Sequence, residues 1–190
     1  MIYLIDNFLN KDLFKETVDC LNSNDYIEHE TPGKSFWLQE SKPEFIKYVL
    51  QKLSEKERCD LECILGFFRI STDTIDSEWR IHSDGIINGQ KPDRAVVLYL
   101  SPKVMKELHG TAFWSHKQYG KKQPDDISNE EFDKLLLNES GDLDKWDLDT
   151  VLGYEQNRLI SYPANYFHSK YPNKAWEEGR QVFVMFYKTK

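Results

Sequence analysis

The chain has 190 residues, which is enough for one domain with a substantial hydrophobic core. Its formal net charge of −7 argues against a general binder of phosphate backbones, because such proteins usually carry a basic face. The three cysteines are odd in number and form no Cys-x-x-Cys pair, so neither a disulfide framework nor a zinc site is expected.

No stretch of the sequence approaches the length of a membrane span, and the first residues lack the pattern of a signal peptide. We therefore expect a cytoplasmic protein without a membrane partner. The single basic cluster, residues 116–122, is expected to be a solvated loop, so no nucleic-acid partner is expected either.

The first third of the chain is predicted to be helical after a short strand at residues 2–5. Asn10 is a suitable N-cap for a first helix. Ser41 and Glu44 have the spacing of a capping box at the start of a second helix. Both helices, placed within about residues 10–58, have apolar residues at helical spacing, namely Phe14, Val18 and Leu21 in the first and Phe45, Ile46, Val49, Leu50 and Leu53 in the second.

From about Ile64 the sequence changes to short runs of β-branched and aromatic residues separated by turn residues. This pattern is typical of an antiparallel sandwich or barrel. We predict a single domain over residues 1–190 that is mainly β with flanking helices, a double-stranded β-helix with the jelly-roll shape of cupins. The predicted strands are residues 65–71, 79–82, 94–100, 111–114, 158–162, 165–168 and 180–187.

An acidic insertion at about residues 118–154 interrupts the predicted strands. Ser128 and Glu131 form a capping box before a short apolar helix face. The following loop, residues 141–150, contains Trp146 among acidic residues. Two interpretations remain open, a lid over a pocket or a patch packed on the barrel.

His82 and Asp84 are the strongest candidates for a metal site. Side chains two apart in an extended segment point to the same side. A mixed imidazole and carboxylate set suits an iron-type ion, for which two histidines and one carboxylate on one octahedral face are expected. His168 is the best third ligand, because late strands return beside early ones in a rolled sheet. The other candidates, His29 and His109, are expected to lie at the surface.

Arg180 opens the last predicted strand, which is otherwise apolar. A buried arginine is costly without an anion, and its planar fork matches a carboxylate. An anionic ligand is therefore expected beside the metal site.

The set His82-x-Asp84, His168 and Arg180 resembles the iron(II)- and 2-oxoglutarate-dependent oxygenases, in particular their prolyl-hydroxylase-like branch. The similarity covers about residues 64–187. Residues 81–85, 110–116 and 157–162 further resemble a poorly characterised bacterial and phage subgroup of that branch. The sequence departs from the family pattern at Leu108-His109-Gly110, where the family has a doubled glycine, and at Ser101, where it has asparagine.

This resemblance implies an iron(II) ion held by His82, Asp84 and His168, with 2-oxoglutarate and dioxygen as co-substrates. Arg180 would bind the far carboxylate of 2-oxoglutarate, and Tyr99 would donate a further hydrogen bond unless it is an ordinary core tyrosine. The expected reaction is hydroxylation of an amino-acid side chain, in a peptide or free, or of a small metabolite, with release of succinate and carbon dioxide. The alternatives are a cupin-like metal-binding module without turnover and a nucleic-acid demethylase of the same superfamily.

Overall fold

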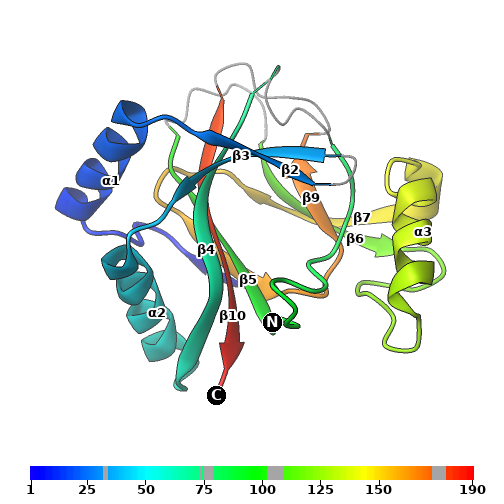
Figure 1. Ribbon diagram of the computed structural model, residues 1–190. Helices are drawn as coiled ribbons and strands as arrows, with labels where there is room; N and C mark the ends of the chain where they lie inside the picture. Colours follow the sequence, from blue (N-terminus) through cyan, green and yellow to red (C-terminus); the bar gives the residue numbers. More distant parts are fainter. Residues whose placement is uncertain (32–33, 73, 75–78, 102–108, 173–178) are drawn as a thin grey trace.

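The computed structural model describes residues 1–31, 34–72, 74, 79–101, 109–172 and 179–190. Its two sheets are antiparallel throughout, and helices flank both sides of the molecule (Figure 1). The larger sheet has the strand order β1 (Tyr3–Ile5), β8 (Leu159–Pro163), β5 (Arg94–Tyr99), β10 (Arg180–Thr189), β4 (Leu61–Ser71), β3 (Lys34–Glu40) and β2 (Ile27–Thr31). The smaller sheet has the order β7 (Trp146–Gly153), β6 (Gly110–His116) and β9 (His168–Tyr171).

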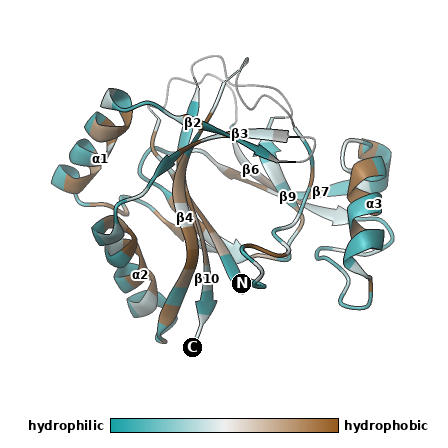
Figure 2. Ribbon diagram, in the orientation of Figure 1, coloured by the Kyte–Doolittle hydropathy of each residue, from teal (hydrophilic) through white to brown (hydrophobic). Residues whose placement is uncertain are grey.

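Strand β10 is in the middle of the larger sheet and is buried on both faces. Phe183, Met185 and Tyr187 belong to the core under α1 (Lys11–Ser23) and α2 (Pro43–Glu57). The alternate residues Val182, Val184 and Phe186 belong to the core between the two sheets. Burial on both faces explains the nearly continuous apolar run of β10. Its neighbour β4 is also strongly hydrophobic, as its colour in Figure 2 shows.

The first predicted helix is confirmed, with the Asn10 side chain accepting a hydrogen bond of 2.9 Å from the Leu13 N–H. The second helix is also present, but its predicted capping box is wrong. Lys42 is the N-cap and makes no side-chain cap hydrogen bond. Pro43 determines this start, because proline at the first helical position is already fixed in a helical φ.

The acidic insertion contains the predicted helix, α3 (Asn129–Glu139), and the capping box of Ser128 and Glu131 is present. The expected loop at residues 141–150 is instead a 3-10 turn, η1 (Leu143–Lys145), followed by β7. Trp146 is buried and its ring packs on Phe167 with 4.8 Å between centroids. The insertion therefore supplies the edge strand β7 of the smaller sheet and packs α3 beside it, which fits the second of the two interpretations better than the first.

Two predicted strands differ in the structure. Residues 79–82 form no strand, and His82 makes only an isolated antiparallel bridge to His168. Strand β9 begins at His168 rather than at Asn165, because the preceding residues form a turn in which the Tyr166 N–H bonds the Pro163 carbonyl at 3.0 Å. The β2–β3 hairpin was not predicted.

Among the described residues, no helix has both the length and the apolar character that crossing a membrane requires.

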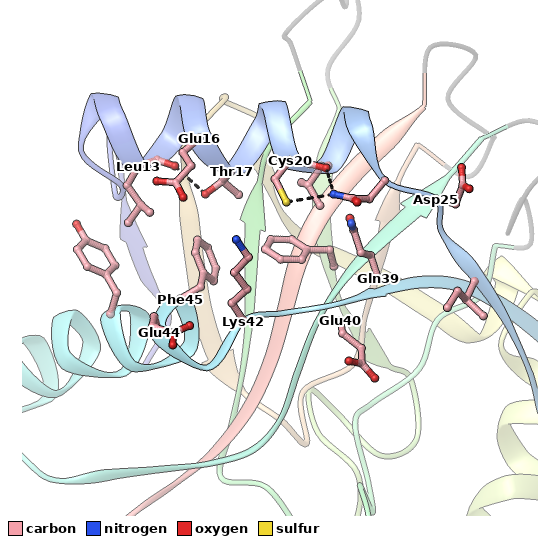
Figure 3. A pocket seen from close by; sticks show the side chains of 15 residues that line it. Leu13, Glu16, Thr17, Cys20, Asp25, Gln39, Glu40, Lys42, Glu44 and Phe45 are labelled. Carbon is pink, nitrogen blue, oxygen red and sulfur yellow. Dashed lines mark hydrogen bonds between the residues drawn. The ribbon is translucent and has the colours of Figure 1, made fainter.

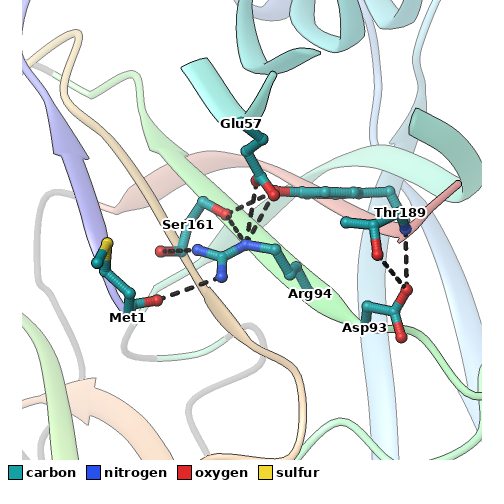
Figure 4. A network of polar contacts seen from close by, with 7 residues as sticks. Met1, Glu57, Asp93, Arg94, Ser161 and Thr189 are labelled. Atoms are coloured by element: carbon teal, nitrogen blue, oxygen red, sulfur yellow. Dashed lines mark hydrogen bonds and ion pairs between the residues drawn. The ribbon is translucent and has the colours of Figure 1, made fainter. Parts of the chain in front are cut away.

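A buried polar network ties four elements and the start of the chain together (Figure 4). The Arg94 guanidinium forms an ion pair with Glu57 at 3.2 Å and donates to the Ser161 side chain and carbonyl and to the Met1 carbonyl. Tyr187 donates its hydroxyl hydrogen to Glu57. The network joins α2 to β5, β8, β10 and the start of the chain.

Replacing Arg94 by leucine is expected to lower the free energy of unfolding by about 3 kcal/mol, because the Glu57 carboxylate would stay buried without its cation. The double variant Arg94→Leu/Glu57→Leu should recover much of this loss in urea titrations. Lys134→Ala is the control, since its ion pair with Glu130 is exposed and contributes less than about 0.5 kcal/mol. Equal losses in the single and double variants would contradict this account of the network.

Candidate metal centre

The structure brings His82, Asp84 and His168 together, with one possible ligand atom from each within 4.8 Å of the others. Backbone hydrogen bonds hold the two segments in place. His82 and His168 exchange N–H to carbonyl bonds of 3.0 and 2.8 Å, and the Asp84 N–H bonds the Ala164 carbonyl at 2.8 Å. Because directly opposite residues in such a bridge face the same side, both imidazoles and the carboxylate converge.

Each histidine ring is oriented by a carbonyl two residues earlier in the chain. Nδ1 of His168 is 2.9 Å from the Tyr166 carbonyl oxygen, and Nδ1 of His82 is 3.2 Å from that of Arg80. A carbonyl oxygen can only accept, so Nδ1 carries the proton in both rings. This tautomer places the basic lone pair on Nε2, the nitrogen that would ligate a metal.

The carboxylate of Asp84 is buried beside the two histidines and requires a compensating positive charge. Its Oδ2 is 3.5 Å from Nε2 of His168 and, within the described part of the chain, has no hydrogen-bond partner. Burial raises the pKa of Asp84, while the nearby charges of His168 and Arg69 act in the opposite direction. A divalent cation would compensate the buried carboxylate, and two imidazoles with one carboxylate suit iron(II). The three residues therefore fit such a metal.

The insertion supports the triad from the side away from the cavity. Phe132 of α3, Trp146 of β7 and Phe167 form one buried apolar cluster that also contains Ile81, the neighbour of His82. The Trp114 N–H bonds the Phe167 carbonyl at 3.0 Å. Both ligand-bearing segments are therefore fixed by packing as well as by backbone hydrogen bonds.

The triad lines a cavity of about 540 Å³ between the two sheets. Arg180 also lines it, is only 7% exposed, and lies with its guanidinium carbon 5.6 Å from the centre of the Tyr99 ring. Burial lowers the pKa of Arg180. An arginine side chain nevertheless stays protonated in proteins. The structure thus places the predicted arginine in the same cavity as the three predicted ligands.

Tyr99 is fully buried and is not among the described residues that line this cavity. Its hydroxyl shares a hydrogen bond of 2.7 Å with the Thr111 hydroxyl, and Thr111 does line the cavity. A direct role of Tyr99 toward a co-substrate stays a prediction. Sequence reasoning missed Thr111 as a residue of the cavity wall, although it follows Gly110 in a motif that was recognised.

One wall of the cavity comes from the unpredicted hairpin. His29 of β2 and Phe36 and Leu38 of β3 line it, so His29 is exposed as expected but belongs to the cavity mouth. None of the described residues in the insertion, 118–154, lines the cavity. A lid formed by this segment therefore has no support in the structure.

A second and larger cavity, of about 670 Å³, lies between α1, α2 and β3 (Figure 3). Leu13 and Thr17 of α1 and Phe45 of α2 line it, together with four acidic side chains, those of Glu16, Asp25, Glu40 and Glu44. The group of possible metal ligands found among the described residues, the triad, lies in the smaller cavity between the two sheets and not in this one. Size alone therefore does not identify the functional site.

Solved structures of other proteins share the overall arrangement of elements described above. HygX from Streptomyces hygroscopicus, with nickel and 2-oxoglutarate bound, matches with a TM-score of 0.64 over 98% of this chain and 82% of its own, at 12% sequence identity. The chain therefore shares its fold with HygX. A Pseudomonas putida prolyl-4-hydroxylase matches with a TM-score of 0.58 over 100% of this chain and 92% of its own, at 12% identity.

A further structural match is SnoK, a non-heme alpha-ketoglutarate-dependent carbocyclase from nogalamycin biosynthesis, with a TM-score of 0.64 over 98% of this chain and 79% of its own, at 11% identity. No protein-family model and no curated protein matches the chain by sequence. The fold is thus common to enzymes whose names state different reactions.

Asp84→Asn is expected to stabilise the chelator-treated protein at pH 7, because burial raises the pKa of this carboxyl and ionising it therefore costs the folded protein stability. The folded protein binds a proton at Asp84 at a higher pH than the unfolded chain does. Wild-type stability should therefore rise relative to the variant as the pH falls through the folded-state pKa. Urea titrations at several pH values measure the difference, and a variant less stable than wild type at pH 7 would contradict it.

Proposed function

We propose that the protein is an iron(II)- and 2-oxoglutarate-dependent dioxygenase whose metal ligands are His82, Asp84 and His168. The observation that carries this proposal is the convergence of two imidazoles and a buried carboxylate in one cavity, with one possible ligand atom from each within 4.8 Å of the others. The two antiparallel sheets are interpreted as those of a double-stranded β-helix, as the sequence predicted. Structural similarity to HygX, which binds nickel and 2-oxoglutarate, supports the same cofactor class.

Arg180 is proposed to bind the carboxylate of 2-oxoglutarate far from the metal in a bidentate, charge-assisted pair. The Thr111 hydroxyl can donate a hydrogen bond to the same carboxylate. It would then accept the hydrogen bond that it shares with the Tyr99 hydroxyl. Iron(II), 2-oxoglutarate and dioxygen together supply the oxidation of a C–H bond, with release of succinate and carbon dioxide. The chain itself orients the co-substrate and limits access of water through its apolar walls.

We place the protein in the prolyl-hydroxylase-like branch, in the bacterial and phage subgroup that the sequence resembles. The structural match to the Pseudomonas putida prolyl-4-hydroxylase supports the branch. The proposed reaction is hydroxylation of an amino-acid side chain, free or in a peptide, or of a small metabolite. The net charge of −7 disfavours a nucleic-acid demethylase, because a phosphate groove needs clustered cations.

Anaerobic addition of iron(II) and 2-oxoglutarate is expected to produce a visible metal-to-ligand charge-transfer band. His168→Ala should abolish the band, because one of the three ligands is lost. His29→Ala is a matched control, since His29 lines the same cavity outside the triad, and it should keep the band. Folded wild-type protein without a band would exclude the proposed cofactor class.

Arg180→Leu is expected to weaken 2-oxoglutarate binding by roughly 10- to 150-fold, since hydrogen bonds to a charged group contribute about 1.5–3 kcal/mol. Arg180→Lys keeps the charge but not the fork and should lose less. Titration of the charge-transfer band measures the affinity, and circular dichroism checks that both variants fold. Unchanged affinity in Arg180→Leu would refute the assigned role. Succinate formation in oxygen separates an oxygenase from a binding module without turnover.

A further inference from the structure

The larger cavity, between α1, α2 and β3, has a buried apolar floor (Figure 3). Its volume of about 670 Å³ lies within the range of small-molecule sites in proteins. Leu21, Phe45 and Phe68 on the floor are buried members of the core under the two helices. Ile27 also lines the cavity and is 65% exposed, so an apolar ligand there would remove its side chain from water. The cavity is therefore suited to an apolar group.

The rim of this cavity is acidic. Among the described residues that line it, one cation, Lys42, stands against four exposed carboxylates, those of Glu16, Asp25, Glu40 and Glu44. Within the part of the chain that the structure describes, none of the four carboxylates forms an ion pair or a side-chain hydrogen bond. Charge complementarity therefore favours a cationic ligand over a neutral or an anionic one.

The C-terminal end of α1 adds to this preference. Cys20 and Leu21 of its last turn line the cavity, as does its C-cap, Asn24, and the last turn contains no basic residue. The C-terminal end of a helix carries partial negative charge, and Asp25 follows directly after the C-cap. A carboxylate is unfavourable at such a position, and a bound cation would compensate both the carboxylate and the helix end.

Gln39 presents a buried hydrogen-bond acceptor to the same cavity. It lines the cavity from β3 (Figure 3). Its Oε1 is buried and has no hydrogen-bond partner among the described residues. An amide oxygen can only accept, and a buried acceptor without a donor is unfavourable. A ligand that carries an N–H group would supply the missing donor.

The larger cavity lies on the opposite face of the sheet from the triad. Leu38 of β3 and Arg69 of β4 are paired, and both line the triad cavity. The next pair, Gln39 and Phe68, lines the larger cavity. Because neighbouring side chains on a strand point to opposite faces, one layer of sheet separates the two cavities. A ligand in the larger cavity is therefore not a substrate of the triad.

We propose that the larger cavity is a second binding site, for a small organic amine that carries an aromatic or branched apolar group. The apolar group packs on Phe45 and Phe68. The ammonium group donates to Oε1 of Gln39, and the carboxylates of the rim compensate its charge. This site goes beyond the proposed function, because none of the triad residues takes part in it.

The test compares three probes that share an indole ring and differ in charge. Tryptamine is cationic at pH 7, tryptophol is neutral and indole-3-acetate is anionic. Each is titrated into the full chain by calorimetry at constant ionic strength. We expect saturable binding of tryptamine to one site, about tenfold weaker binding of tryptophol, and no binding of indole-3-acetate, since a hydrogen bond from a charged donor is stronger than one from a neutral donor.

The double variant Glu16→Gln/Glu40→Gln should weaken tryptamine binding roughly three- to tenfold, because two exposed charges at the rim are lost. Binding of tryptophol should not change. Asp19→Asn/Glu28→Gln is the matched control, since it removes two exposed carboxylates outside the cavity, and it should bind tryptamine as wild type does. Equal losses in the two double variants would mean that net charge, not the cavity, attracts the amine.

Cys20→Phe places a ring in the cavity from a half-buried position of its wall and should abolish binding of both tryptamine and tryptophol. Cys59→Phe, at another half-buried cysteine that does not line the cavity, should leave binding unchanged. Circular dichroism checks that both variants fold.

Three results would overturn the proposal. They are no saturable binding of tryptamine, equal affinity for tryptamine and tryptophol, and tryptamine binding that survives in folded Cys20→Phe protein. Binding of a basic amphipathic peptide without binding of tryptamine would identify a docking face for a partner protein and would overturn it as well. The outcome does not depend on the charge-transfer band of the iron site, so this proposal and the proposed function can fail separately.

Discussion

The reciprocal backbone bridge between His82 and His168 is the constraint on which the site depends. It joins a segment that forms no strand to the first residue of β9, and it sets both imidazoles on one face. Asp84 follows from the same geometry, because it is two residues further along and its N–H is tied to the Ala164 carbonyl. Three candidate metal-binding side chains are thus positioned mainly by backbone hydrogen bonds, which depend little on side-chain identity.

The two sides of this bridge have different physical characters. Behind it, the apolar cluster of the insertion packs on Ile81 and Phe167 and fixes the segments that carry the ligands. In front of it, the cavity gathers cationic side chains in a protein that is acidic as a whole.

Several features of the site could be predicted from the sequence because they depend on local rules. His82 and Asp84 share a face through the alternation of an extended chain, even though the segment is not a strand of either sheet. Arg180 enters the cavity because it continues the inward row of β10. The helices α1 and α3 begin where their capping residues, Asn10 and Ser128, predicted.

The sequence by itself therefore predicted the candidate metal-ligating residues, the arginine of the cavity and most of the strands, since alternation and capping act over a few residues. Only the tertiary structure decided the position of the β2–β3 hairpin as a cavity wall, the packing of the insertion away from the cavity, and the bridge between His82 and His168. These features arise from contacts between segments far apart in the chain. Such contacts leave no periodicity in the sequence from which they could be predicted.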